Sequence, residues 1–187
     1  MEHLKAFTAR FIDLSISELE ALESIFTPVP IKKMDHLMIS GDYVKDIYFI
    51  DSGLFRGYYM KEGEEYTTGF YYSPLMFAEL FSIRKSTATE FNLQALQVSN
   101  CYKASFYELE KLMVHFPNIK RLFFRLYEML YMYGVKRQVS FIYDSPKERY
   151  DKLCKEFPKI IDDIPLQYIA SYLGIKPETL SRIRRKG

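Results

Sequence analysis

The sequence has few of the residues that build disulfide frameworks or metal centres. It contains two cysteines, Cys101 and Cys154, which are too few for a disulfide framework or a four-cysteine iron–sulfur site. Its three histidines, His3, His36 and His115, include no H-x-H pair, which a metal-dependent enzyme of the cupin type would need. No Ser-His-Asp arrangement or phosphate-binding loop appears either. We therefore predict a protein that is not an enzyme, with no catalytic residues and no metal site.

Long apolar runs are also missing. No window approaches about 18 uninterrupted apolar residues, so we predict no membrane-spanning helix and no membrane partner. The first residues, MEHLKAFTARF, lack a basic region followed by an apolar stretch and a small-residue cleavage site. The content of 48% hydrophobic and 27% charged residues is typical of a globular protein. We expect this protein to be cytoplasmic.

Charge is unevenly distributed along the chain, although the net charge is only +2. Residues 146–187 hold ten Lys and Arg against six Asp and Glu, a balance of +4, whereas residues 1–145 have a balance of −2. A polyanionic partner would therefore meet the C-terminal part of the chain. A solvated basic tail is the alternative that the charge alone leaves open.

The N-terminal region predicts one helix before any strand. Apolar residues recur at helical spacing from Leu14 to Phe26. Ser15 or Ser17 can cap the first turn, and Pro28 and Pro30 are expected to end the helix.

The composition of the next region is typical of short strands. Residues 38–72 are rich in β-branched and aromatic side chains, and a second stretch of this kind covers residues 90–104. Short strands separated by glycine and aspartate turns favour an all-β barrel or sandwich. The glycines that break the first stretch are Gly41, Gly53, Gly57, Gly63 and Gly69.

Helical periodicity returns after residue 104. Residues 105–117 predict a short helix, and residues 117–144 predict a long one that continues to the Asp144-Ser145-Pro146 stop. The long helix must bury its apolar stripe, either on the strands before it or on a second copy of the chain, and we predict the second, a homodimer. That stripe consists of Ile119, Leu122, Phe123, Leu126, Met129, Leu130 and Tyr133.

Residues 164–186, IPLQYIASYLGIKPETLSRIRRK, carry the most specific motif. With Leu166 as the first position of a helix-turn-helix, Ala170 stands where only a small residue lets the second helix approach the first. Gly174 stands where the turn needs a positive φ. The apolar positions that hold the two helices together are filled by Ile169, Leu173, Ile175, Leu180 and Ile183.

In such a motif the N-terminal part of the second helix enters the major groove of DNA. Arg182 can donate a bidentate pair to guanine, and Glu178 can accept from cytosine. Surface solubility of the arginines, and a favourable charge at the helix N-terminus for Glu178, are the alternatives for single residues. The remaining predicted DNA contacts, read mainly as phosphate contacts, are Lys176, Thr179, Ser181, Arg184, Arg185 and Lys186.

With these parts in this order, the chain resembles the Crp/Fnr family of bacterial transcription regulators. The resemblance rests on residues 39–60, 74–81 and 105–117 and on the helix-turn-helix, where Glu178 and Arg182 match the base-reading positions. It implies an α+β fold with a jelly-roll, cyclic nucleotide-binding-like barrel, a long dimerisation helix and a helical DNA-binding domain. It also implies a homodimer that binds a pseudo-palindromic operator in double-stranded DNA, with RNA polymerase as a further partner.

From the resemblance we expect three parts. A β-barrel sensor domain with flanking helices covers residues 1–116, a dimerisation helix covers residues 117–144, and a helix-turn-helix domain covers residues 145–187.

The resemblance also locates an effector pocket, at Ala78, Glu79, Leu80, Thr89 and Glu90. Family members that bind cyclic AMP hold its phosphate with a helix N-terminus and an arginine, and its ribose with a glutamate. Here the glycine of that motif is Ala78, and the arginine position falls on Thr89 beside the acidic Glu90. These residues therefore argue against cyclic AMP as the effector. The effector would be an unknown small molecule, or the protein has no effector. A dimeric signalling adaptor, or a ligand-binding barrel without specific DNA binding, remains the alternative function.

Overall fold

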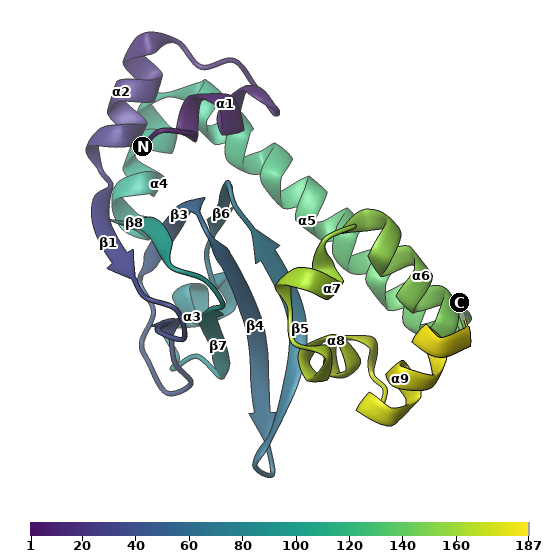
Figure 1. The fold of residues 1–187 in the computed structure, drawn as a ribbon. Coiled ribbons are helices and arrows are strands. Elements are labelled where there is room, and N and C mark those ends of the chain that lie inside the picture. Colours follow the sequence, from purple (N-terminus) through teal and green to yellow (C-terminus); the bar gives the residue numbers. More distant parts are fainter. Residues whose placement is uncertain (187) are drawn as a thin grey trace.

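The computed structural model describes residues 1–186, apart from the Lys186 side chain. A β-sandwich lies at one end of the molecule, and short helices cover one side of it. A long helix leads from there to a helical C-terminal part (Figure 1). None of the helices in the described part of the chain is long and apolar enough to cross a membrane.

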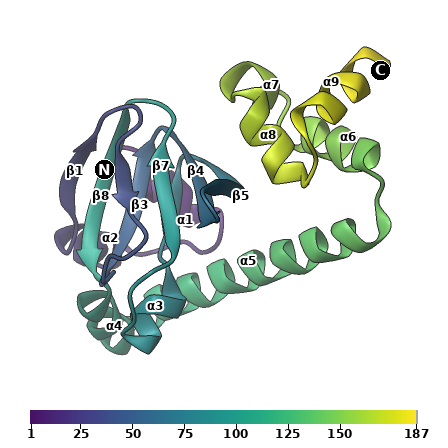
Figure 2. The same ribbon diagram turned by 90° about the horizontal axis from the view of Figure 1, so that it is seen from below.

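Eight strands form two four-stranded sheets, with strand orders β1-β8-β3-β6 and β2-β7-β4-β5. All pairs are antiparallel, and the two sheets face each other as in a jelly roll (Figure 2). The predicted barrel is therefore two packed sheets that do not close into a continuous barrel. The strands are β1 Thr27–Ile31, β2 His36–Met38, β3 Asp46–Ser52, β4 Leu54–Lys61, β5 Glu64–Tyr72, β6 Leu75–Phe77, β7 Phe91–Ala95 and β8 Ser99–Ser105.

Aromatic rings fill the space between the sheets. The Phe77 and Phe91 rings stack with centroids 5.7 Å apart, and the Tyr71 ring meets Phe77 edge-on at 5.1 Å. Gly57 makes room for them, because a Cβ there would lie 2.3 Å from the Phe91 ring. Burial raises the pKa of the Tyr71 hydroxyl to about 12. The interior of the sandwich is thus packed with side chains at this point.

Two N-terminal helices precede the sheets, α1 (Leu4–Ala9) and α2 (Ile16–Ser24). The prediction of Ser15 as the cap of α2 is confirmed, since its hydroxyl accepts from the backbone N–H of Glu18 in a capping box. The prediction that the prolines end this helix is wrong. Pro28 and Pro30 lie within β1, an edge strand in which a missing N–H is tolerated.

The helices after β8 are α4 (Phe106–His115) and α5 (Pro117–Tyr143), as the periodicity predicted. The apolar stripe predicted as a dimer seam is divided between two environments. Its first half packs into the core beneath α1 and α2, where it is buried with Leu4, Phe7 and Leu22. Its second half, Met129, Leu130 and Tyr133, is exposed. The first half consists of Ile119, Leu122, Phe123 and Leu126. For these residues the prediction of a dimer seam is wrong, and the alternative, burial against the chain's own strands and helices, is correct.

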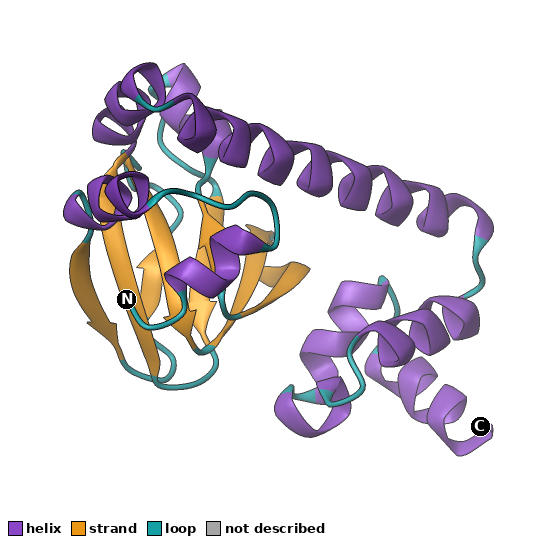
Figure 3. Cartoon of the chain, turned by 90° about the horizontal axis from the view of Figure 1, so that it is seen from above, coloured by secondary structure: helices purple, strands orange, loops and turns teal. Residues whose placement is uncertain are grey.

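After α5 the chain reverses direction into four short helices beside the second sheet (Figure 3). Ser145 caps the first of them in a capping box with Glu148, and Pro146 occupies its first position, as predicted. These helices are α6 Pro146–Glu156, α7 Ile160–Asp163, α8 Leu166–Leu173 and α9 Pro177–Lys186.

Candidate DNA-binding surface

Helices α8 and α9 form the helix-turn-helix that the motif predicted. Ala170 is completely buried where α8 meets α9, and Ile169, Leu173 and Leu180 are buried around it. Gly174 has φ +67° and ends α8, with its N–H donating to the carbonyls of Ala170 and Ser171. A β-carbon at this φ would be strained. Both steric requirements of the motif are therefore met.

The exposed face of α9 carries the predicted base-reading residues. Glu178, Ser181, Arg182 and Arg185 are exposed and spaced three or four residues apart, so they share one side of the helix. Leu180 faces the opposite way, into the core. This arrangement leaves a polar, mostly basic helix face free to contact a partner.

The other predicted DNA contacts are less uniform. Lys176 and Arg184 are exposed, and Thr179 is half-buried. Arg184 lies close to the Tyr150 hydroxyl of α6. Burial is the main cause that raises the pKa of this hydroxyl, and the charge of Arg184 acts in the opposite direction and lowers it. Such a position is compatible with a structural role for Arg184. The side chain of Lys186 lies outside the described residues.

Comparison with known proteins finds bacterial regulators that are similar to this chain. The fumarate and nitrate reduction regulatory protein of Salmonella typhi is 28% identical over 184 residues, which span 91% of this chain and 72% of that protein. FixK2 from Bradyrhizobium japonicum has the same fold, with a TM-score of 0.72 at 16% identity over 87% of this chain and 84% of that one. The chain has the fold of the Crp/Fnr regulators.

Other solved structures agree on the fold. CLP from Xanthomonas campestris, described as a c-di-GMP responsive global regulator, aligns with a TM-score of 0.73 at 14% identity over 92% of this chain and 91% of that one. No family model matches the sequence. At these identities the solved structures show that this chain shares the Crp/Fnr fold and nothing about its ligand.

The predicted effector positions do not fit the cyclic nucleotide that the Crp/Fnr fold implies. Glu79 is the N-cap of α3 (Leu80–Lys85), and its carboxylate accepts from the backbone N–H groups of Phe81 and Ser82 at 3.2 and 3.0 Å. The helix terminus that would receive a phosphate therefore already binds a carboxylate of the chain itself. Thr89 is buried, and its hydroxyl accepts from the N–H of Phe91 at 3.0 Å.

The remaining effector positions add negative charge and apolar packing. Burial raises the pKa of the Tyr59 hydroxyl, and the nearby carboxylates of Glu79 and Glu90 raise it further. Both acidic groups are near enough to this side chain to raise its pKa, and each would repel a phosphate that bound there. Ala78 and Leu80 pack against the core that contains the first half of α5.

The two cysteines offer no site for an iron–sulfur cluster. Cys101 lies in β8, and burial raises the pKa of its thiol to about 12, so it is protonated and a poor metal ligand. Cys154 lies in α6, in the helical C-terminal part. Glu2, His3 and Asp51 gather three potential ligand atoms, and Asp51 already accepts from the His3 backbone N–H at 2.9 Å.

An exposed apolar stripe on α5 was missed by the sequence analysis. It is formed by Phe124, Tyr131, Val135 and Ile142, which are 62%, 73%, 40% and 70% exposed. Their spacing of seven, four and seven residues places them along one line of the helix, as in a coiled-coil seam. This line lies on the side of the helix opposite the buried Leu122 and Leu126. The heptad spacing was visible in the sequence. The stripe on the other side of the helix, which contains Leu122 and Leu126, is more apolar, and only that stripe was predicted.

Proposed function

We propose that this protein is a DNA-binding transcription regulator, and the exposed face of α9 carries the proposal. A helix-turn-helix presents the start of its second helix to the major groove. Here that face offers Glu178, Ser181, Arg182 and Arg185 to solvent on a helix whose other side is buried. Arginine and glutamate are suited to guanine and cytosine edges, respectively. The Crp/Fnr fold and the similar regulator from Salmonella typhi support the same conclusion.

We propose further that the protein acts as a homodimer through the exposed α5 stripe, Phe124, Tyr131, Val135 and Ile142. A stripe of large apolar side chains along a free helix face is typical of a surface that pairs with another helix. A two-fold axis along α5 would give the dimer two α9 helices, and helix-turn-helix dimers meet successive major grooves, about 34–36 Å apart, of a pseudo-palindromic operator. A cytoplasmic location fits this proposal, and RNA polymerase as a further partner rests on the resemblance alone.

The proposal is tested by selecting DNA fragments from the source genome with the purified protein. The affinity of the protein for the selected fragments is then measured by fluorescence anisotropy. Specific binding that weakens steeply with salt is expected, because phosphate contacts release counterions. Binding that is weak, unselective and insensitive to salt would contradict the proposal and favour the signalling adaptor.

Arg182→Ala is expected to weaken binding to the selected operator by about 1–3 kcal/mol and to relax the base preference at one position. The reason is that Arg182 lies on the exposed α9 face and can donate two hydrogen bonds to one guanine. Anisotropy titrations against the operator and its single-base variants measure both effects. Arg184→Ala is the matched control for base preference, which it should leave unchanged, since Arg184 is predicted to contact phosphate and lies near Tyr150 of α6. An equal loss on every sequence would mean that Arg182 contacts phosphate only.

Cyclic AMP is expected neither to bind nor to change DNA affinity. Glu79 occupies the end of α3, and Glu90 adds a second carboxylate near the same tyrosine. Isothermal titration calorimetry with millimolar cyclic AMP should give no saturable heat, and operator titrations with and without it should coincide. Saturable binding would show that the Glu79 carboxylate leaves the helix terminus when the nucleotide arrives.

A further inference from the structure

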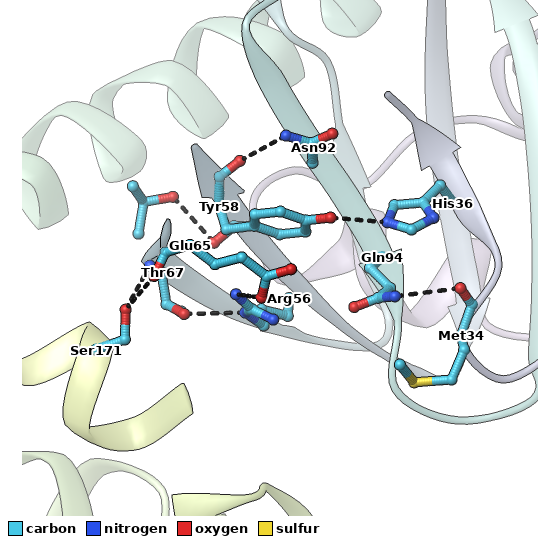
Figure 4. A network of polar contacts seen from close by, with 11 residues as sticks. Met34, His36, Arg56, Tyr58, Glu65, Thr67, Asn92, Gln94 and Ser171 are labelled. Carbon is cyan, nitrogen blue, oxygen red and sulfur yellow. Dashed lines mark hydrogen bonds and ion pairs between the residues drawn. The ribbon is translucent and has the colours of Figure 1, made fainter. Parts of the chain in front are cut away.

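The first helix of the helix-turn-helix is hydrogen-bonded to the sensor sheet. The Ser171 hydroxyl of α8 accepts from the backbone N–H of Thr67 at 2.9 Å and donates to the carbonyl of Glu65 at 3.0 Å (Figure 4). Both groups belong to β5, the last strand of its sheet. The free edge of such a strand presents unpaired backbone groups, and a covering element satisfies them. One serine side chain does so here for one donor and one acceptor.

A buried arginine lies beneath the same helix. Arg56 of β4 is completely buried, with Nε donating to the Thr67 hydroxyl at 2.9 Å and Nη2 to the Glu65 carboxylate at 2.6 Å. Its guanidinium lies between two rings, 4.3 Å from the centroid of Tyr58 and 3.7 Å from that of Tyr168. Tyr168 belongs to α8, so the C-terminal part supplies one of the two rings that cover this charge.

The contact between the C-terminal helices and the sheet is extensive, but one of its hydrogen-bond donors has no partner among the described residues. Leu54 and Leu96 of the sensor pack into the core of the C-terminal helices, and the Tyr72 ring stacks on Phe157 at 5.3 Å. Arg56 Nη1, however, is buried without a hydrogen-bond partner among the described residues. A buried donor without a partner is costly, and water would reach it if α8 moved away. Movement of α8 would therefore offer this donor a solvent partner, which lowers the cost of undocking.

The docked arrangement also brings negative charge to the DNA-binding part. The turn between β4 and β5 is acidic, with Glu62 and Glu64 exposed and Glu65 hydrogen-bonded through its carbonyl to Ser171. In helix-turn-helix complexes the first helix crosses the DNA backbone. Phosphates that approach α8 in this arrangement would meet the carboxylates of the turn, and like charges repel.

We propose that these contacts form an autoinhibitory latch, which we call the α8–β5 latch and define as Ser171 and Tyr168 docked on Arg56, Glu65 and Thr67. The latch holds the helix-turn-helix against the acidic β4–β5 turn, and its release increases affinity for DNA. This inference rests on the proposed DNA-binding function. The presence of the latch can be measured without DNA, so the two proposals can fail separately.

The first experiment measures amide exchange of Thr67 by NMR in the DNA-free protein. The Thr67 N–H lies on the free edge of β5 with Ser171 as its partner, so its protection reports docking directly. Ser171→Ala is expected to speed its exchange about 5- to 10-fold, because the substitution removes the acceptor of this N–H and weakens docking, whereas Arg56→Met keeps the acceptor and reports docking alone. Ser171→Thr retains the hydroxyl and should restore protection. Ser24→Ala, which removes a helical hydroxyl far from the latch, should leave Thr67 unchanged.

The second experiment measures affinity for the selected double-stranded operator by anisotropy. Ser171→Ala is expected to bind about 5- to 10-fold more tightly than the unaltered protein, because apparent affinity scales with the fraction of the binding-competent state. Arg56→Met leaves every helix-turn-helix residue in place and removes the guanidinium on which Tyr168 of α8 stacks, so it should weaken docking and change affinity in the same direction. Ser24→Ala should bind as the unaltered protein does.

An Arg56→Met protein that is folded, exchanges Thr67 faster and binds the operator no more tightly would overturn autoinhibition. Unchanged Thr67 exchange in Ser171→Ala would overturn the latch itself. If no variant binds DNA while Thr67 exchange responds as expected, the DNA-binding function fails, and autoinhibition fails with it, although the contact exists.

Discussion

A protein carrying Val135→Glu is expected to be monomeric and to bind the selected operator at least about 100-fold more weakly than the unaltered protein. Val135 lies in the exposed α5 stripe between Tyr131 and Ile142. In a symmetric pair, two glutamates would be buried near each other on the helix seam. A monomer contacts one half-site, so it loses the gain of about 10²- to 10⁴-fold that linked binding provides. Light scattering after size exclusion measures the mass, and anisotropy measures the affinity.

Met129→Glu is the matched control for this experiment. Met129 is 44% exposed, on the same helix but away from the stripe, and it was part of the seam that the sequence predicted. Glutamate is a good helix former, so neither substitution should disturb α5 itself. If Met129→Glu dissociates the dimer and Val135→Glu does not, the seam lies on the originally predicted face of the second half of α5.

Ala170→Leu is expected to unfold the helix-turn-helix and to abolish operator binding. Ala170 is completely buried at the contact of α8 with α9. The extra carbons have no space there, and such overpacking costs about 1–3 kcal/mol. Units of about 40 residues have little stability to lose. Amide exchange in α8 and α9 should rise towards that of an unfolded chain, while exchange in β3 and β7 stays slow.

Ala170→Ser controls for the substitution itself, since serine is nearly as small as alanine. It should retain slow exchange in α9 and measurable operator binding. Full operator affinity in the Ala170→Leu protein would contradict the close approach of the two helices at this residue.

The helix-turn-helix was predictable because its constraints are local. Ala170 and Gly174 satisfy steric requirements set by residues within the motif itself, and the sequence displays them directly. The same holds for the capping boxes that begin with Ser15 and Ser145. Features set by tertiary contacts were harder to predict.

Helix α5 illustrates the limit, because it is apolar on more than one side. Leu122 and Leu126 are buried in the N-terminal core, whereas Tyr131 and Ile142 are exposed. Periodicity identifies an apolar face but not what covers it. Arg56 is a second example, since its burial depends on Tyr168, more than a hundred residues away. Nothing in the local pattern around Arg56 indicates that an aromatic ring from another part of the chain would cover it.

The short helix α1 was also missed. Six residues are too few for a stable isolated helix or for a clear periodic pattern. Its stability comes from Leu4 and Phe7, which are buried in the same core as the first half of α5.

The division of α5 has a mechanical consequence. The helix packs on the N-terminal core as far as Leu126, and its remaining 17 residues, to Tyr143, extend to the C-terminal helices, where Arg137 donates to the Tyr172 carbonyl. At 1.5 Å per residue this extension is about 25 Å long, so a rotation of about 5° at its base displaces its far end by about 2 Å. The helix is thus a lever, and a small repacking around α1 and α2 would become a displacement at Tyr143 comparable to the length of a hydrogen bond.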